Sequence, residues 1–123
     1  MENKLNTTAL LRACADTINV LREETGNEKL TAQMLVTYLA VAVRKEVPLN
    51  ELPKLARTSG SAMSRNVWNI LGPGTPKEPG PNLIVAEADP YDRKRKLVQL
   101  TPRGKAVADK IVDRVKRYVA IAA

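Results

Sequence analysis

Residues 72–81, GPGTPKEPGP, contain four prolines and three glycines, which exclude a regular helix or strand over this stretch. Before it, apolar residues recur at helical spacing; after it, two short runs rich in apolar and β-branched residues precede one more helix. Aromatic residues make up only 3% of the chain, so the core must be aliphatic. We therefore predict a single domain over residues 1–123, α+β but mostly α, in the order α-α-α-α-β-β-α.

The first two predicted helices differ in how much of their surface is apolar. The first covers residues 7–24 and carries a narrow apolar seam at 3-4-3 spacing, of the kind found where helices pair. This seam consists of Leu11, Cys14, Ile18 and Leu21. Thr31 caps the second helix, which extends to about Arg44 and is apolar on most sides. We expect the second helix at the centre of the domain.

Two short helices are expected next. One covers residues 51–57, with Asn50 as its cap and Pro53 at the third helical position, where a missing N–H is harmless. The other covers residues 61–71, and its inner face consists of Met63, Val67 and Ile70. Two short helices joined by a tight turn and packed on a buried third helix are typical of the helix-turn-helix. Ordinary core packing is the alternative, because any small helical bundle contains helix pairs.

A β-hairpin and a last helix are predicted after the Pro/Gly stretch. Residues 82–87 and 96–100 are expected to form two antiparallel strands that flank an eight-residue tip, ADPYDRKR. Thr101 as cap and Pro102 at the first helical position then begin a helix that extends to about residue 120. Its apolar face consists of Val107, Ile111, Val115, Tyr118 and Val119.

The positive charge of the chain is concentrated in one segment. Residues 93–117 hold ten of the twenty Lys and Arg residues and only two acids, Asp109 and Asp113, a local net charge of +8. The remaining residues carry ten bases and eleven acids. Such localisation points to a polyanionic partner, either nucleic acid or an anionic membrane surface. A solvated cationic face without a partner is the alternative.

Several functions are excluded by what the sequence lacks. The chain has no His and one Cys, so it cannot build a Cys/His zinc site, a Cys-His nucleophile pair or a Ser-His-Asp triad. We therefore predict no enzyme, no catalytic residue, no metal and no cofactor. The N-terminal residues are too polar for a signal peptide, and the longest near-apolar run, residues 35–43, is too short to cross a bilayer. A cytoplasmic chain without a membrane partner is expected.

The order of helices and hairpin resembles the MarR family of bacterial winged helix-turn-helix regulators. The family's wing reads Asp-x-Arg, a strand and Leu-Thr-x-x-Gly; here Asp92-Arg93-Lys94 begins that pattern and Leu100-Thr101-Pro102-Arg103-Gly104 completes it. Upstream, Glu51-Leu52 and residues 62–67, AMSRNV, resemble the family's entry into its recognition helix. This sequence has Lys94 where the family has Arg, Pro53 where it has Ala, the insertion 72–81, and one C-terminal helix where a second is common.

The resemblance implies a separate function for each segment of the chain. A helix-turn-helix core (31–71), the loop (72–81) and a β-wing (82–100) would bind double-stranded DNA as a transcriptional regulator. Polar side chains of the recognition helix would reach the major groove, and the basic wing the minor groove or phosphates. The predicted DNA-binding residues are Ser59, Ser61, Ser64, Arg65, Asn69, Arg93, Lys94, Arg95 and Lys96.

A homodimer is expected, in which residues 1–30 and 102–123 form a helical dimerisation region. The predicted interface residues are Leu11, Cys14, Ile18, Leu21, Ile111, Val115 and Tyr118. Within this region Cys14 is interpreted as a buried apolar residue rather than a reactive thiol, because nothing around it in the sequence would stabilise a thiolate.

Other interpretations stay open at this stage. The chain could be a non-specific architectural DNA-binding protein of a plasmid or phage, or an adaptor that binds a protein such as RNA polymerase. Many MarR-type proteins are released from DNA by small aromatic ligands, but no pocket signature supports a small-molecule effector here. Trp68 could stack on DNA or pack beneath the wing, and Gly104 could allow a close backbone approach or simply be tolerated in its helix.

Overall fold

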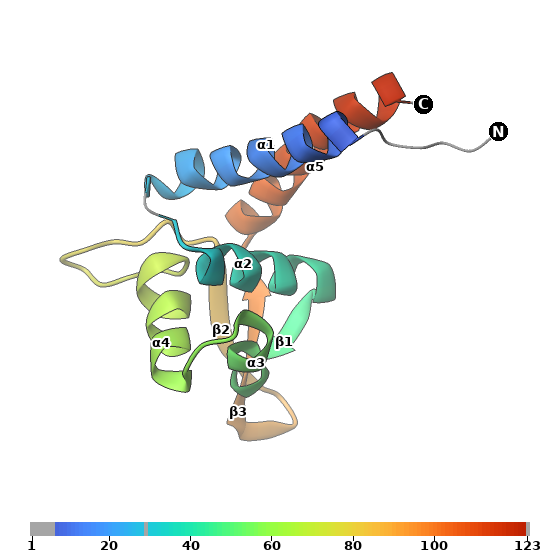
Figure 1. The fold of residues 1–123 in the computed structure, drawn as a ribbon. Coiled ribbons are helices and arrows are strands. Elements are labelled where there is room, and N and C mark those ends of the chain that lie inside the picture. The colour runs from blue at the N-terminus through green and yellow to red at the C-terminus, as the bar shows by residue number, and fades with distance from the viewer. Residues whose placement is uncertain (1–6, 29, 123) are drawn as a thin grey trace.

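A computed structural model describes residues 7–28 and 30–122. Helix α1 (Thr7–Thr25) and helix α5 (Pro102–Ala122) lie side by side at one end of the molecule, and α2 (Ala32–Arg44) lies across its centre (Figure 1). Thr31 caps α2 as predicted, because its hydroxyl accepts a hydrogen bond from the Met34 N–H at 3.3 Å. The inner face of α2 is buried, whereas its outer face leaves Val36, Leu39 and Val43 exposed.

The helix-turn-helix begins with a 3₁₀ turn, η1 (Leu49–Glu51), which leads into the short helix α3 (Leu52–Ala56). The prediction that Asn50 caps this helix is wrong, because Asn50 lies inside the 3₁₀ turn and makes no capping hydrogen bond. Pro53 lies in the first turn of α3, where no N–H is needed. Arg57 then ends α3 in the left-handed conformation, with φ of 55°.

The helix predicted over residues 61–71, named the recognition helix below, is α-helical over a shorter stretch. Helix α4 covers Gly60–Arg65, and the segment that continues it, η2 (Asn66–Ile70), is π-helical. The Ser59 hydroxyl caps α4 by accepting the Ala62 N–H at 3.1 Å. Met63 and Val67 are buried and Ile70 is half-buried, so the predicted inner face is correct.

Three antiparallel strands form a small sheet in the order β1-β3-β2. Strands β2 (Ile84–Asp89) and β3 (Asp92–Leu100) make the predicted hairpin. Strand β1 (Glu46–Pro48) was not predicted; its three residues pair with Leu97–Gln99 of β3. The observed order is therefore two helices, a short strand, two helices, a hairpin and a last helix, which is the winged-helix arrangement.

The hairpin corrects the predicted position of the cations. The turn consists of Pro90 and Tyr91 alone, not of eight residues. In the pairing with β2, Ala88 lies opposite Lys96 and Asp89 opposite Asp92. Residues 93–95 therefore have no counterpart on β2 and form a bulge on β3. The basic residues belong to this bulge and to the strand beside it, not to the turn.

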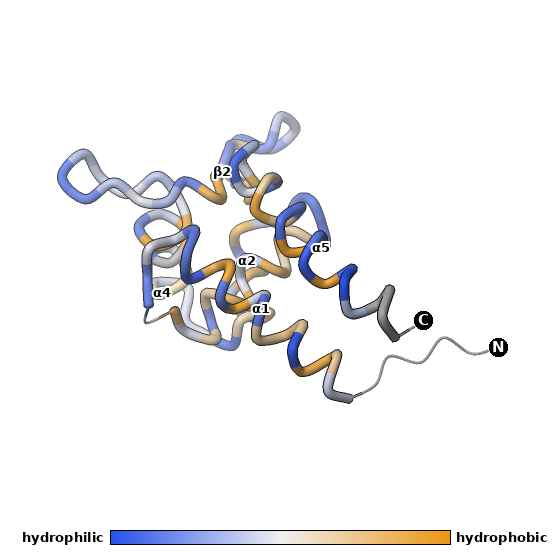
Figure 2. Tube along the Cα trace, turned by 90° about the horizontal axis from the view of Figure 1, so that it is seen from above, coloured by the Kyte–Doolittle hydropathy of each residue, from blue (hydrophilic) through white to orange (hydrophobic). Residues whose placement is uncertain are grey.

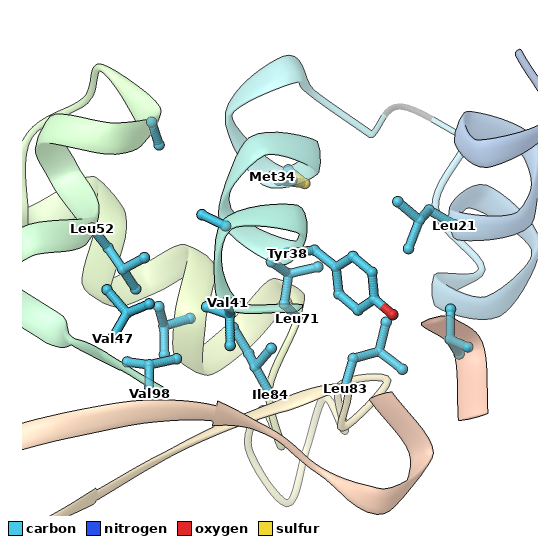
Figure 3. Close-up of a cluster of buried hydrophobic side chains, with 14 of the residues drawn as sticks. Leu21, Met34, Tyr38, Val41, Val47, Leu52, Leu71, Leu83, Ile84 and Val98 are labelled. Carbon is cyan, nitrogen blue, oxygen red and sulfur yellow. The ribbon is translucent and has the colours of Figure 1, made fainter. Parts of the chain in front are cut away.

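The core lies between α2, the sheet and the helix-turn-helix (Figure 3). Tyr38, Val41, Leu52, Leu83, Ile84 and Val98 are among its fully buried side chains. Figure 2 shows apolar residues gathered at this centre, while the two projecting loops are hydrophilic. The core is aliphatic as predicted, apart from Tyr38, whose hydroxyl donates a 2.7 Å hydrogen bond to the Gly104 carbonyl of α5.

The junction between the hairpin and α5 is tightly packed. The Thr101 hydroxyl accepts the Gly104 N–H at 3.0 Å and donates to the Asn82 carbonyl at 2.6 Å, so Thr101 caps α5 and also binds the start of the hairpin. A Cβ on Gly104 would lie 2.0 Å from the Leu83 carbonyl oxygen. Gly104 is therefore the site of a close backbone approach.

The Pro/Gly stretch is an irregular loop, as predicted, and it projects as an arm from the end of the recognition helix (Figure 1). A bridge between Gly74 and Pro79 closes the arm, together with hydrogen bonds from the Thr75 N–H to the Glu78 carbonyl and from the Gly80 N–H to the Pro73 carbonyl. No described helix has the length and apolar character that a membrane span requires.

Candidate nucleic-acid interface

A cleft of about 750 Å³ lies between the recognition helix, the turn before it and the wing. Its walls come from η1 and α3, from α4 and from the basic part of β3. The lining residues are Leu49, Asn50, Pro53, Gly60, Ser64, Asp92, Lys94, Arg95 and Lys96. The cleft thus brings Ser64, predicted from the helix, together with three of the four predicted wing cations.

The wing cations are exposed and uncompensated. In the part of the chain that the structure describes, none of Arg93, Lys94, Arg95 and Lys96 forms an ion pair. The two nearby carboxylates instead accept backbone hydrogen bonds: Asp89 binds the Tyr91 N–H at 2.9 Å and Asp92 the Lys94 N–H at 3.1 Å. The four neighbouring cations repel one another, and an anionic partner would reduce this electrostatic repulsion.

The Asp92 contact explains why Lys94 is compatible with the wing. The carboxylate binds the main-chain N–H of residue 94, a donor that Arg and Lys share. The hairpin geometry at this point therefore does not require an Arg side chain, and the Lys94 ammonium is free to line the cleft.

The predicted residues of the recognition helix are spread along its outer side. Ser61, Ser64, Arg65 and Asn69 are exposed, and Ser59 is exposed while it caps the helix. Ser64 alone of these lines the cleft. Asn69 lies in the π-helical segment, so it is not in helical register with Ser61 and Arg65. Trp68 is 46% exposed.

Sequence reasoning missed two contributions to this surface. Asn50 in the 3₁₀ turn and Pro53 in α3 line the cleft opposite the wing, and no local sequence pattern predicts this. Tyr91 occupies the hairpin turn and is 97% exposed. Its position follows from the two-residue turn, which the prediction of an eight-residue tip concealed.

Helices α1 and α5 pack antiparallel through polar contacts as well as apolar ones. Lys110 forms an ion pair with Glu24 at 2.5 Å, and the Tyr118 hydroxyl donates a hydrogen bond to the Asp16 carboxylate. This hydrogen bond raises the pKa of Tyr118. The two helices therefore form one unit within the chain.

The seven predicted interface residues fall into three groups. Leu11 is 65% exposed and Cys14 is also exposed, so the prediction that Cys14 is buried is wrong for the single chain. Leu21 and Ile111 are buried in the core of their own chain, where they contribute to folding rather than to free surface. Ile18, Val115 and Tyr118 are half-buried.

The five helices and the small antiparallel sheet define a winged helix-turn-helix fold, the fold of MarR-family transcriptional regulators. No family model and no curated protein matches the sequence. Solved structures of such regulators do match this chain, and the match covers most of each regulator's length.

Three of these structures show the range of the similarity. The BpsR regulator of Bordetella bronchiseptica is 22% identical, with 92% of this chain and 80% of BpsR covered and a TM-score of 0.52. PcaV from Streptomyces coelicolor, in complex with its natural ligand, is 18% identical, with 98% and 80% covered and a TM-score of 0.57. A MarR mutant from E. coli complexed with operator DNA is 16% identical, with 90% and 74% covered and a TM-score of 0.52.

Proposed function

We propose that this chain is a sequence-specific, double-stranded DNA-binding transcriptional regulator that acts as a homodimer. The observation that carries the proposal is the cleft in which three uncompensated cations, Lys94, Arg95 and Lys96, meet Ser64 of the recognition helix. The similarity to a MarR protein in complex with operator DNA supports it.

The recognition helix supplies sequence reading in this proposal. A major groove about 12 Å wide admits one helix, and short side chains such as Ser61 and Ser64 let the backbone approach the base edges. Arg65 is the side chain with the reach to bind guanine in a bidentate manner. Arg93, Lys94, Arg95 and Lys96 supply affinity through phosphates or the minor groove.

The exposed apolar residues of α1 and α5 support the homodimer. Leu10, Leu11 and Val112 are exposed on the helices that pack together at the end opposite the wing. A two-fold axis through such an interface gives two recognition helices, and half-sites about 10 bp apart.

We propose no enzymatic activity, cofactor or metal for this chain, since it has no His and one exposed Cys. A cytoplasmic location follows from the proposed target, DNA. BpsR and PcaV are associated with 6-hydroxynicotinic acid and a natural ligand respectively. Similarity to regulators with such ligands does not identify an effector of this chain, and we propose none.

Binding-site selection from random duplexes at two salt concentrations tests the proposal. We expect an enriched pseudo-palindrome whose retention falls steeply with salt. Retention without enrichment would mean a non-specific architectural DNA-binding protein. No retention at near-physiological salt would contradict DNA binding and favour an adaptor for a protein partner.

A further inference from the structure

Tyr91 is the most exposed aromatic residue of the described chain. It is 97% exposed, whereas Trp68 is 46% exposed, Tyr118 is half-buried and Tyr38 is fully buried. The next most exposed large apolar residue is Val43, at 77%. A side chain this exposed contributes nothing to the core of the described chain, so its position calls for another explanation.

The hairpin holds Tyr91 at its apex rather than letting it fold back. Pro90 fixes its own backbone φ, and the Asp89 carboxylate accepts the Tyr91 N–H at 2.9 Å. On the other side of the turn, Asp92 accepts the Lys94 N–H at 3.1 Å. Both carboxylates therefore stabilise the turn, which holds Tyr91 exposed at the end of the hairpin.

Cations follow the turn on one of the two strands. The bulge of residues 93–95 comes after Asp92, and Lys96 lies beside it on β3. An exposed aromatic residue next to exposed cations suits a polyanion that also offers stackable faces, which is the chemistry of a nucleic-acid groove. An anionic membrane surface shares part of that chemistry. The cleft shared by the wing and the recognition helix favours the duplex.

We propose that Tyr91, supported by Pro90, is a wedge that enters the minor groove beside the major-groove site and partly unstacks one base step. The inference rests on the proposed function and adds a determinant of specificity to it. Pyrimidine–purine steps such as TA unstack most easily, so the wedge favours them at that position. The wing cations bind phosphates and carry no such preference.

The test uses a duplex enriched by binding-site selection, or one duplex of fixed sequence if no sequence is enriched. Two versions of the duplex differ at one base step, which is either TA or AA. This step lies where the wild type protects the minor groove and the wing variant Arg93→Ala/Arg95→Ala does not. We expect Tyr91→Ala to weaken binding to the TA duplex about tenfold, the scale of one base–aromatic stack, and to weaken binding to the AA duplex much less. Tyr91→Phe keeps the ring and should keep the preference for TA. The matched control, Val43→Ala, removes an exposed apolar side chain on α2 and should change neither affinity.

Energy transfer between dyes at the duplex ends gives a second measurement. Wild-type binding should shorten the end-to-end distance, and Tyr91→Ala should shorten it less. Equal affinities of wild type and Tyr91→Ala for both duplexes, with a loss in Arg93→Ala/Arg95→Ala, would overturn the wedge and leave DNA binding intact. Absence of duplex binding by the wild type would overturn both proposals. Loss of binding to phosphatidylserine vesicles in Tyr91→Ala, with duplex binding unchanged, would also overturn the wedge.

Discussion

Replacing Gly104 by Ala should destabilise the fold, although the change usually stabilises a helix. Gly104 is in the first turn of α5, and helix propensity alone predicts a gain of about 1 kcal/mol for Ala. An added Cβ would lie 2.0 Å from the Leu83 carbonyl oxygen, so the two segments must separate by about 1.4 Å to reach the 3.4 Å of ordinary contact. That carbonyl also accepts the Thr101 N–H at 3.0 Å, and the Gly104 carbonyl accepts the Tyr38 hydroxyl at 2.7 Å.

The magnitude follows from these opposing effects. Overpacking costs about 1–3 kcal/mol, and each strained hydrogen bond adds up to about 1 kcal/mol. After subtraction of the propensity gain, we expect Gly104→Ala to lower the free energy of unfolding by about 2 kcal/mol. For a domain of this size the midpoint of thermal unfolding should fall by roughly 8 °C.

Urea denaturation followed by circular dichroism measures this difference, with Gly60→Ala as the matched control. Gly60 begins α4, and a Cβ there meets no atom within 4 Å, so Gly60→Ala should keep the propensity gain of up to about 1 kcal/mol without a clash. A Gly104→Ala variant as stable as the wild type, or more stable, would refute the close packing of α5 on the backbone of Leu83, just before β2.

Three further perturbations test other parts of the structure. Tyr38→Phe removes the donor to the Gly104 carbonyl and should lower stability by about 1–2 kcal/mol at pH 7. Because burial raises the pKa of Tyr38, the wild type should lose stability as the pH rises above about 10, and the variant should lose less; urea titrations at pH 7 and 11 measure both. Leu11→Glu should leave the chain folded and shift it from dimer to monomer in sedimentation velocity, since Leu11 is 65% exposed. Arg65→Ala should reduce discrimination between a selected duplex and competitor DNA by about 1–3 kcal/mol in competition binding, while equal losses for both duplexes would remove Arg65 from sequence reading.

Helix starts that depend on a capping side chain could be predicted from neighbouring residues in the sequence. The sequence predicts Thr31 and Thr101 as caps because each precedes a helical apolar pattern, and in the structure both hydroxyls accept hydrogen bonds from helix N–H groups. Asn50 carried a similar signal but lies inside a 3₁₀ turn. Packing of Leu52 and Val47 in the core determines the path of the chain there, so tertiary contacts override the local preference.

The remaining differences arise from pairing between distant segments. Strand β1 has three residues, one of them Pro48, and exists because β3 pairs with it. The sequence shows which residues of the hairpin are cationic. It does not show the bulge at residues 93–95, because the bulge depends on which residue of β3 pairs with Ala88 of β2. For the same reason Ser64 and Lys94 could each be predicted as DNA-binding residues from the sequence, but their position around one cleft could not be predicted.

The central claim is that the uncompensated cations of the wing bind duplex DNA. The equilibrium constant for a 25-bp duplex, measured against salt concentration for wild type and for Arg93→Ala/Arg95→Ala, tests it most directly. Each phosphate contact contributes about 0.9 to the slope of log K against log salt, so loss of two contacts should reduce the slope by about 1.8 and weaken binding to all sequences. An unchanged slope and affinity in the variant would contradict the claim.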